Sequence, residues 1–215
     1  MADAEPENLH VSVLLNETID LVDPQPNEVI VDATLGLGGH TQGLFEREPN
    51  ITVIGIDQDA DAIDNARSKL SRFGDRLTIV KSNFSRIRTI LESLDIEKVD
   101  GVIADLGVSS LQFDSETRGF SFRFDAPLDM RMDPGGKMPT AAELLGNLRE
   151  EEIANMIYEF GEERFSRRIA RRIVERRNTG DPIRTTKQLA ELVERAVPRK
   201  PKEKIHPATK TFQAL

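Results

Sequence analysis

Cysteine is absent from this 215-residue chain, and histidine occurs only three times, as His10, His40 and His206. Without cysteine the chain forms no disulfide and offers no thiolate ligand to a metal. Three scattered histidines do not supply the ligand cluster of a zinc site. We therefore expect neither a disulfide framework nor a bound metal.

Long apolar stretches are also absent. No run of about 18 apolar residues occurs, so no membrane-spanning helix is expected. Residues 1–5 are acidic and lack both the apolar core of a secretory signal and the arginines of a transit peptide. These absences predict a soluble, cytoplasmic protein. The length of 215 residues allows one large domain or one domain that carries an insertion.

The net charge of −8 conceals an uneven distribution. Residues 164–215 hold 15 Lys and Arg against 5 Asp and Glu, whereas the rest of the chain holds 14 against 32. A basic lobe on an acidic body suits a partner with a phosphate backbone, because each paired phosphate releases counterions. Arginine-rich helix faces are also found merely solvated, so charge alone leaves both possibilities open.

Among the features present, the most informative is a glycine loop between two apolar runs. Residues 29–31 are apolar and end on Asp32, and a loop containing Gly36, Gly38 and Gly39 follows. A second apolar run over 51–56 ends on Asp57. Glycines let backbone N–H groups approach a ligand, and an acid at the next strand end can accept ribose hydroxyl protons. The pattern predicts a site for an adenosine cofactor.

The alternation of strands and helices continues to about residue 110. Further strands are expected over 77–80 and 99–104, and helices over 59–73 and 84–94. The strands are apolar without alternation, which is typical of a parallel sheet covered on both faces. Asp32, Asp57 and Asp105 then fall at carboxyl ends of strands, where such sheets bind ligands.

The spacing of the glycines favours a cofactor without phosphate. Gly36 and Gly38 fit the first and third positions of the dinucleotide pattern, but Thr41 occupies the sixth. Asp32 would repel a pyrophosphate and would suit the sulfonium and ammonium groups of S-adenosylmethionine. The rival is a nicotinamide-dependent oxidoreductase, which Tyr158, the single tyrosine, does not support because no Tyr/Lys proton relay is recognisable.

The absence of cysteine also limits what a methyltransferase could modify. Methylation of a pyrimidine carbon normally needs a thiol nucleophile, so an oxygen or an exocyclic nitrogen is the expected acceptor. Asp105 follows the last strand and stands where a group that receives protons from an amine would belong. The alternative is that Asp105 only holds cofactor or caps the next turn.

Residues 112–136 are irregular and include arginines that alternate with aromatic residues from Arg118 to Phe124. Such a segment could stack bases and pair with phosphates. The alternative, which residue types alone favour slightly, is a loop that three phenylalanines fix to a core. The sequence leaves both open.

The periodicity from Thr140 to Val197 is helical and indicates a separate bundle, with Thr140 and Thr185 as N-caps. One face carries Phe165, Ile169, Ile173 and Val174, which leaves the intervening arginines on other faces. Residues 199–204 are expected to form a basic connector, and residues 209–215 to begin another helix.

Several long segments resemble the ribosomal RNA small subunit methyltransferase H family. They are residues 10–17 (HVSVLLNE), 32–41 (DATLGLGGHT), 105–110 (DLGVSS), 118–121 (RGFS), 127–133 (PLDMRMD) and 211–215 (TFQAL). The resemblance implies an S-adenosylmethionine-dependent methyltransferase with a Rossmann-like parallel α/β sheet and an inserted helical domain. Its substrate would be N4 of a cytidine in the decoding region of small-subunit (16S-type) ribosomal RNA, free or in the assembled subunit. The base would have to leave its stack to react.

The resemblance also implies roles for individual residues. The cofactor would be held by Gly38, Gly39, His40, Asp57, Phe84, Asp105 and Gln112, with Asp57 at the ribose and Phe84 at the adenine. Asp105 is the candidate acceptor of the amine protons. Candidate RNA contacts are Arg118, Arg123, Arg131, Arg167, Arg168, Arg171 and Arg172.

The expected domains are the first part of the cofactor domain over 1–110, an RNA-facing loop and helical insertion over 111–205, and a return to the first domain over 206–215. Family members continue beyond the last of these segments with further strands. The sheet is therefore expected to be incomplete, with an open edge that could pair with another chain. A catalytically inactive RNA-binding protein is the remaining alternative.

Overall fold

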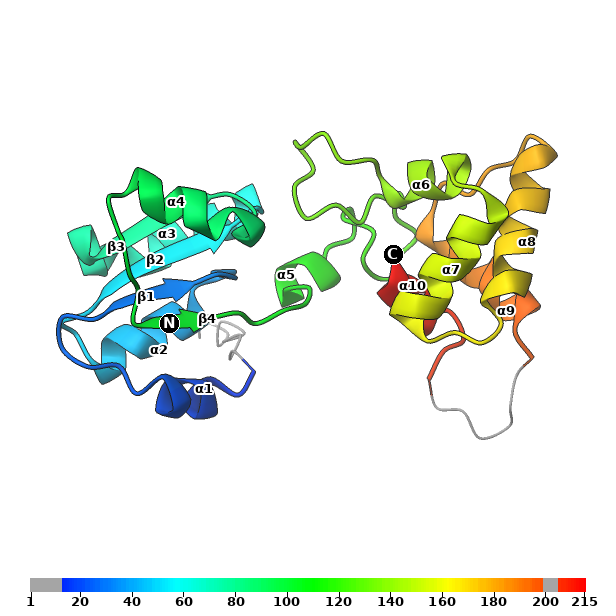
Figure 1. Ribbon diagram of the computed structural model, residues 1–215. Coiled ribbons are helices and arrows are strands. Elements are labelled where there is room, and N and C mark those ends of the chain that lie inside the picture. The colour runs from blue at the N-terminus through cyan, green and yellow to red at the C-terminus, as the bar shows by residue number, and fades with distance from the viewer. Residues whose placement is uncertain (1–12, 199–204) are drawn as a thin grey trace, which may run out of the picture. The chain divides into compact units, whose positions relative to one another are not determined.

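The computed structural model describes residues 13–198 and 205–215 (Figure 1). Residues 10–12 of the first family segment and the predicted connector over 199–204 lie outside the described residues. The chain divides into two compact units, one up to Gly107 and one from Val108. The parallel α/β fold that the sequence predicts is confirmed in the first unit.

The first unit is built on a parallel sheet, in which the described residues form four strands in the order β3-β2-β1-β4. The strands are β1 (Val29–Asp32), β2 (Thr52–Asp57), β3 (Leu77–Lys81) and β4 (Gly101–Ile103). The helices are α1 (Leu15–Val22), α2 (Gly39–Arg47), α3 (Ala60–Leu70) and α4 (Ile87–Ser93), with 3₁₀ turns at Ser71–Arg76 and Phe84–Arg86. The expected helix over 84–94 thus begins as a 3₁₀ turn.

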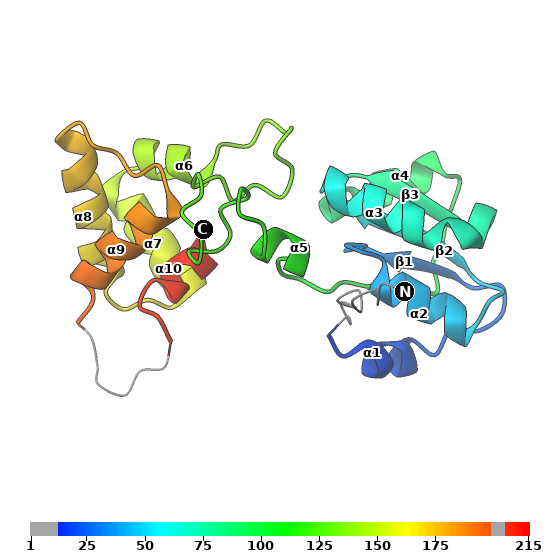
Figure 2. The same ribbon diagram turned by 180° about the vertical axis from the view of Figure 1, so that it is seen from behind.

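Neighbouring residues of β1 serve opposite faces of this sheet. Ile30 packs with Leu44 and Phe45 of α2, whereas Val31 packs with Ile90 of α4. Both Ile30 and Val31 are fully buried, which explains why the strand shows no polar alternation. Both views show α1 and α2 on one side of the sheet and α4 on the other (Figures 1 and 2).

The second unit is mainly helical. Its helices are α5 (Ser110–Phe113), α6 (Ala141–Asn147), α7 (Glu150–Gly161), α8 (Ser166–Asn178), α9 (Thr186–Ala196) and α10 (Thr209–Ala214). The predicted N-caps are confirmed, because Thr140 and Thr185 each close a capping box with the residue three positions on. Ile169 and Ile173 of α8 are buried in the core, as predicted, while Phe165 and Val174 are half-buried.

The last helix of the described chain packs within the second unit. Phe212 of α10 belongs to the same apolar core as Ile157 of α7. The two helices approach so closely that a Cβ at Gly161 would collide with the carbonyl oxygen of Lys210. The division predicted from the sequence returned residues 206–215 to the first domain; in the structure these residues contact α7 instead. As an assignment of functional domains, that division stays a prediction.

Candidate functional site

The strand order places a switch point between β1 and β4. From β1 the chain moves outward to β2 and β3, and it then returns to β4 on the other side of β1. Loops that leave the carboxyl ends of β1 and β4 therefore diverge, and a crevice outside those ends is where open α/β sheets bind ligands. The glycine loop after β1 and Asp105 after β4 both lie at this edge.

Two glycines of the glycine loop adopt backbone conformations that favour glycine. Gly36 and Gly38 have positive φ angles of 51° and 76°, in the left-handed region. A Cβ at Gly38 would also come within 2.5 Å of a methyl carbon of Leu70 on α3. The loop thus passes close to α3 before α2 begins at Gly39, whose first turn includes the buried His40.

Asp57 ties the glycine loop to the end of β2. One carboxylate oxygen accepts the N–H of Gly36 at 2.7 Å, and the other accepts the N–H of Asp59 at 2.9 Å. A carboxylate has about four acceptor positions, so these two bonds leave capacity for the hydroxyls of a ligand. The side chain is half-buried, which suits a residue that both supports the loop and meets a ligand.

Asp32 lies inside the unit rather than facing a ligand. Only 1% of its surface is exposed, and its two oxygens accept the hydroxyl of Thr41 at 2.7 Å and the N–H of Thr34 at 3.2 Å. Burial raises the pKa of Asp32, and the bonds from Thr41 and Thr34 oppose that rise. The sequence argument that Asp32 would face the cofactor is therefore corrected, because its carboxylate is used to join β1 to α2.

Thr34 joins the loop after β1 to the loop after β4. Its hydroxyl oxygen accepts the backbone N–H of Asp105 at 2.7 Å, across 71 residues of sequence. Asp105 itself is exposed, as a residue that contacts a substrate must be. The sequence analysis gave Thr34 no role, and only its position two residues after Asp32, at the end of β1, could have indicated that it lies at the site.

The remaining predicted cofactor contacts, Phe84, His40 and Gln112, belong to three different elements. Phe84 begins the 3₁₀ turn after β3 and is 42% exposed, so its ring is available for stacking. His40 lies within hydrogen-bond distance of the carbonyl of Val13, with 3.3 Å between Nε2 and the oxygen. Gln112 belongs to the second unit, where it is buried and forms a capping box with Ser109. Its role in closing a cofactor site stays a prediction.

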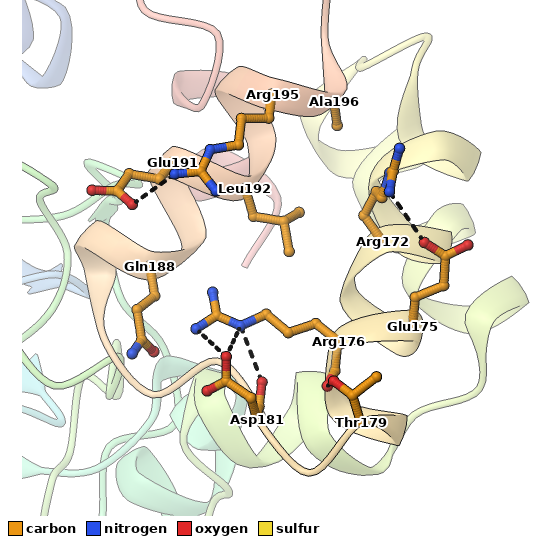
Figure 3. A pocket seen from close by; sticks show the side chains of 10 residues that line it. All are labelled: Arg172, Glu175, Arg176, Thr179, Asp181, Gln188, Glu191, Leu192, Arg195 and Ala196. Atoms are coloured by element: carbon orange, nitrogen blue, oxygen red, sulfur yellow. Dashed lines mark hydrogen bonds and ion pairs between the residues drawn. The ribbon is translucent and has the colours of Figure 1, made fainter.

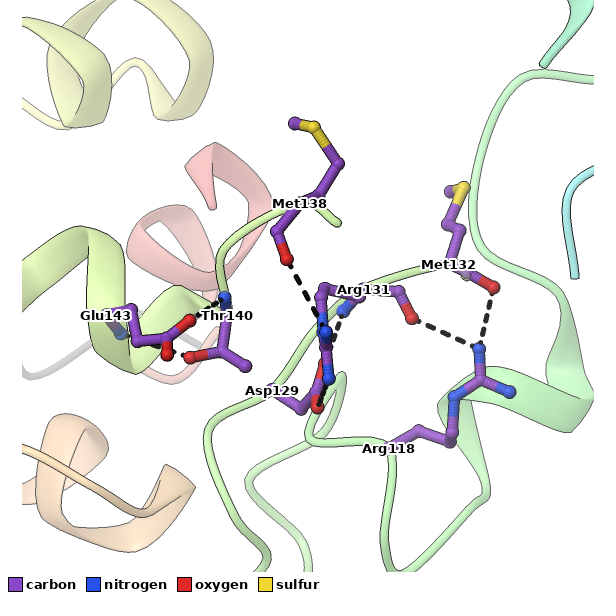
Figure 4. Close-up of polar contacts among 7 residues, drawn as sticks. All are labelled: Arg118, Asp129, Arg131, Met132, Met138, Thr140 and Glu143. Carbon is purple, nitrogen blue, oxygen red and sulfur yellow. Dashed lines mark hydrogen bonds and ion pairs between the residues drawn. The ribbon is translucent and has the colours of Figure 1, made fainter. Parts of the chain in front are cut away.

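Two of the candidate RNA-binding arginines hold a loop together (Figure 4). Arg118 donates to the carbonyls of Arg131 and Met132 at 3.1 and 3.0 Å. Arg131 forms a bidentate pair with Asp129, at 2.8 and 2.7 Å, which lowers the pKa of that carboxyl. Both guanidinium groups therefore stabilise the loop, and a contact with RNA would use their remaining N–H donors.

The sequence left open whether the phenylalanines of the same segment stack on bases or fix the loop to a core, and the structure shows both buried and exposed ones. Phe120 is buried, and Phe122 packs against His206 and Phe212 with ring centres 4.7 and 5.0 Å apart. Phe124 is exposed. The nearby guanidinium of Arg123 lies over the Phe113 ring at 5.2 Å. Two phenylalanines thus fix the segment to the core.

The arginines of α8 fall into two groups. Arg167, Arg168, Arg171 and Arg172 are exposed, as predicted. Arg171 and Arg172 lie 3.8 and 3.5 Å from the carboxylates of Glu150 and Glu175, whereas within the described residues Arg167 and Arg168 form no ion pair. By contrast, Arg177 turns inward and donates to three carbonyls at the end of α6.

A groove of about 650 Å³ lies between α8 and α9 (Figure 3). Each of its three arginines has a carboxylate partner: Arg172 with Glu175, Arg176 with Asp181, and Arg195 with Glu191. The charges that line the groove therefore cancel. A polyanion would gain more from the open side of α8, where Arg167 and Arg168 lie.

Together, the switch-point crevice, the glycine loop and the acid at the end of β2 define a Rossmann-like α/β unit with a candidate cofactor crevice. The particular family follows from comparison with known proteins. The profile of the MraW methylase family matches residues 7–215, and the chain belongs to this family.

Relatives named "Ribosomal RNA small subunit methyltransferase H" match nearly the whole chain. The protein from Gloeobacter violaceus is 49% identical over 207 residues, which are 96% of this chain and 62% of the relative. Those from Carboxydothermus hydrogenoformans and Desulfotalea psychrophila are 48% identical, over 96% and 97% of this chain and 65% and 71% of the relatives. The chain thus spans less than two thirds of the first two relatives. Within the described residues no helix is long and apolar enough to cross a membrane.

Proposed function

We propose that this chain acts in the S-adenosylmethionine-dependent methylation of N4 of a cytidine in small-subunit ribosomal RNA, in the cytoplasm. Family membership and the names of the relatives support the reaction class and the RNA substrate. The observation that carries the proposal is the crevice itself. One loop after β1 is bonded both to Asp57, on the cofactor side, and to the backbone of Asp105, on the acceptor side.

The chemistry of the crevice fits a cofactor that carries positive charge and no phosphate. Asp57 would accept the ribose hydroxyls, and the exposed ring of Phe84 would lie against the adenine. The backbone of Gly38 and Gly39 and the first turn of α2 at His40 would approach the amino-acid part. The sixth position of the dinucleotide pattern is Thr41 rather than glycine, which opposes a dinucleotide.

The bound cofactor would supply an activated methyl group. The amine of cytosine is a weak nucleophile because its lone pair is delocalised into the ring. The exposed carboxylate of Asp105 would accept a proton from this nitrogen as the new N–C bond forms. Gln112 would help to close the site. Placement of the amine in line with the methyl group would provide most of the rate.

The second unit would bind the RNA. The surface best suited to phosphates is the open side of α8, with Arg167 and Arg168, and Arg171 and Arg172 would extend it. Exposed ion pairs at helical spacing contribute little, so a phosphate can replace Glu175 as the partner of Arg172. The loop that contains Arg118, Arg123 and Arg131 would face the target nucleotide, flipped from its stack.

Calorimetric titration with S-adenosylhomocysteine, with NAD in parallel, tests the cofactor. We expect the chain to bind the former and not the latter. Asp57→Ala is expected to weaken binding at least tenfold, because it removes the ribose acceptor and the anchor of Gly36. Asp64→Ala, which removes an exposed acid of α3 paired with Arg67, is the matched control and should bind normally. Binding of NAD alone would overturn the methyltransferase assignment.

The salt dependence of RNA binding tests the second unit. Replacing Arg167 and Arg168 with alanine should lower the slope of log affinity against log salt by about 1.4, at about 0.7 for each contact with single-stranded phosphate. Arg195→Ala is the control, because this arginine is 82% exposed but pairs with Glu191 in the neutral groove. An unchanged slope in the double variant would mean that these arginines are only solvated. RNA binding without any cofactor binding would support the non-catalytic alternative.

A further inference from the structure

Beyond Ile103 the pairing of β1 with β4 departs from a regular ladder. The N–H of Ala33 donates to the carbonyl of Ile103 at 2.8 Å. In a regular parallel ladder the next bond would run from the N–H of residue 105 to the carbonyl of Ala33. Instead, the N–H of Asp105 donates to the side-chain hydroxyl of Thr34 at 2.7 Å. A side chain thus takes the place of a backbone acceptor where the two loops begin to separate.

Thr34 is itself held in place from the other side. Its N–H donates to one oxygen of Asp32, whose other oxygen accepts the hydroxyl of Thr41 on α2. Thr41 and Asp32 are almost fully buried, so this part of the network is fixed. The residue that follows Thr34 is fixed too, since the N–H of Leu35 donates to Ile56 of β2 at 2.9 Å.

The chain after β4 has much less support. Asp105 and Leu106 are exposed, and the Leu106 side chain is 70% exposed. A loop of this kind would allow Asp105 to move relative to the sheet unless a bond fixed its backbone. The bond from the Asp105 N–H to Thr34 provides such an attachment directly at the residue.

We propose that Thr34 is a positioning residue, whose hydroxyl fixes the backbone of Asp105 and thereby sets the position of its carboxylate relative to the cofactor loop. This inference rests on the proposed role of Asp105 in the reaction. Thr34 would not touch the reacting atoms. A displacement of about 1 Å at a reacting group can lower a rate about 100-fold, so loss of this bond should appear in the chemical step.

Thr34→Val tests the proposal, because valine keeps the shape of threonine and removes the acceptor oxygen. Thr34→Ser keeps the oxygen. Thr52 is the first residue of β2 and lies away from the carboxyl ends of the strands, so Thr52→Val is the control for a threonine-to-valine change in the same sheet. Each variant is measured for S-adenosylhomocysteine affinity, for kcat and KM with RNA, and for hydrogen exchange of the Asp105 amide.

In Thr34→Val we expect faster exchange at Asp105 and kcat lowered about 10- to 100-fold, with a smaller loss of cofactor affinity because Asp105 is one of several candidate cofactor contacts. Thr34→Ser should restore both exchange protection and kcat, and Thr52→Val should change neither. An unchanged kcat in Thr34→Val, or an equal loss in Thr34→Ser, would overturn the proposal. If the wild type binds RNA and cofactor without transferring methyl groups, the proposed function fails, whereas the exchange measurement still decides whether Thr34 holds Asp105.

Discussion

Arg177 provides a sharp test of how the structure divides the arginines of α8. Its guanidinium donates to the carbonyl oxygens of Leu145, Gly146 and Leu148, at 3.0, 3.1 and 2.6 Å. These carbonyls lie at or just after the end of α6, where helices leave acceptors unsatisfied and where positive charge is favourable. Arg177→Met removes the donors and keeps much of the apolar stem.

The size of the effect follows from the burial of these bonds. The bonds to Leu145 and Leu148 are partly buried, and the bond to Gly146 is exposed. Hydrogen bonds that involve a charged group contribute about 1.5–3 kcal/mol each, and exposed ones contribute less. We therefore expect Arg177→Met to lower the free energy of unfolding by about 3 kcal/mol. All three bonds come from Nη1, so Arg177→Lys, which keeps a charged donor nitrogen on a side chain one atom shorter, should lose about half of that.

Urea unfolding followed by tyrosine fluorescence measures this effect. Tyr158 is the single tyrosine of a chain without tryptophan, and it lies on α7, so its emission reports on the second unit. Arg168→Met is the matched control, because Arg168 is exposed on the same helix; it should change the free energy of unfolding by less than about 0.5 kcal/mol. Equal losses in Arg177→Met and Arg168→Met, or no loss in either, would refute the reasoning.

Two further predictions concern Asp32 and the contact between α7 and α10. Burial raises the pKa of the Asp32 carboxyl above its unfolded value of about 3.9, so the folded state binds a proton at Asp32 more tightly than the unfolded state does. As pH rises from about 4 through the raised pKa, the free energy of unfolding should therefore fall relative to that of Asp32→Asn. Urea unfolding of both proteins across this range measures the difference, and a constant difference would contradict it. Gly161→Ala should cost about 1–3 kcal/mol because its Cβ meets the Lys210 carbonyl, whereas Gly146→Ala, with no atom within 4 Å of the added carbon, should be neutral or slightly stabilising in thermal unfolding.

Local pattern was sufficient for most elements. The apolar runs predicted the strands from Val29 to Ile103, because a strand buried on both faces needs no polar alternation. Thr140 and Thr185 were predicted as N-caps, and the capping boxes that they form are contacts within one turn. Helical periodicity likewise predicted that Ile169 and Ile173 of α8 are core and that Arg167 and Arg168 are exposed.

The functional assignments came from the order and length of the family segments rather than from periodicity. The sequence could identify Asp57 and Asp105 as acids that follow strands, since carboxyl ends of parallel strands meet at one edge. Their roles, and those of Gln112 and the candidate RNA contacts, stay predictions until the binding experiments are done.

The sequence by itself thus determined most of the elements, the glycine loop and the family. Only the tertiary structure decided that Asp32 is buried, that Thr34 meets Asp105 across 71 residues, and that Arg177 turns inward while Arg168 does not. The physical reason is the range of the interactions. Periodicity and capping depend on neighbours within a few residues, whereas the partner of a hydroxyl or guanidinium depends on which distant backbone atoms folding brings within about 3 Å.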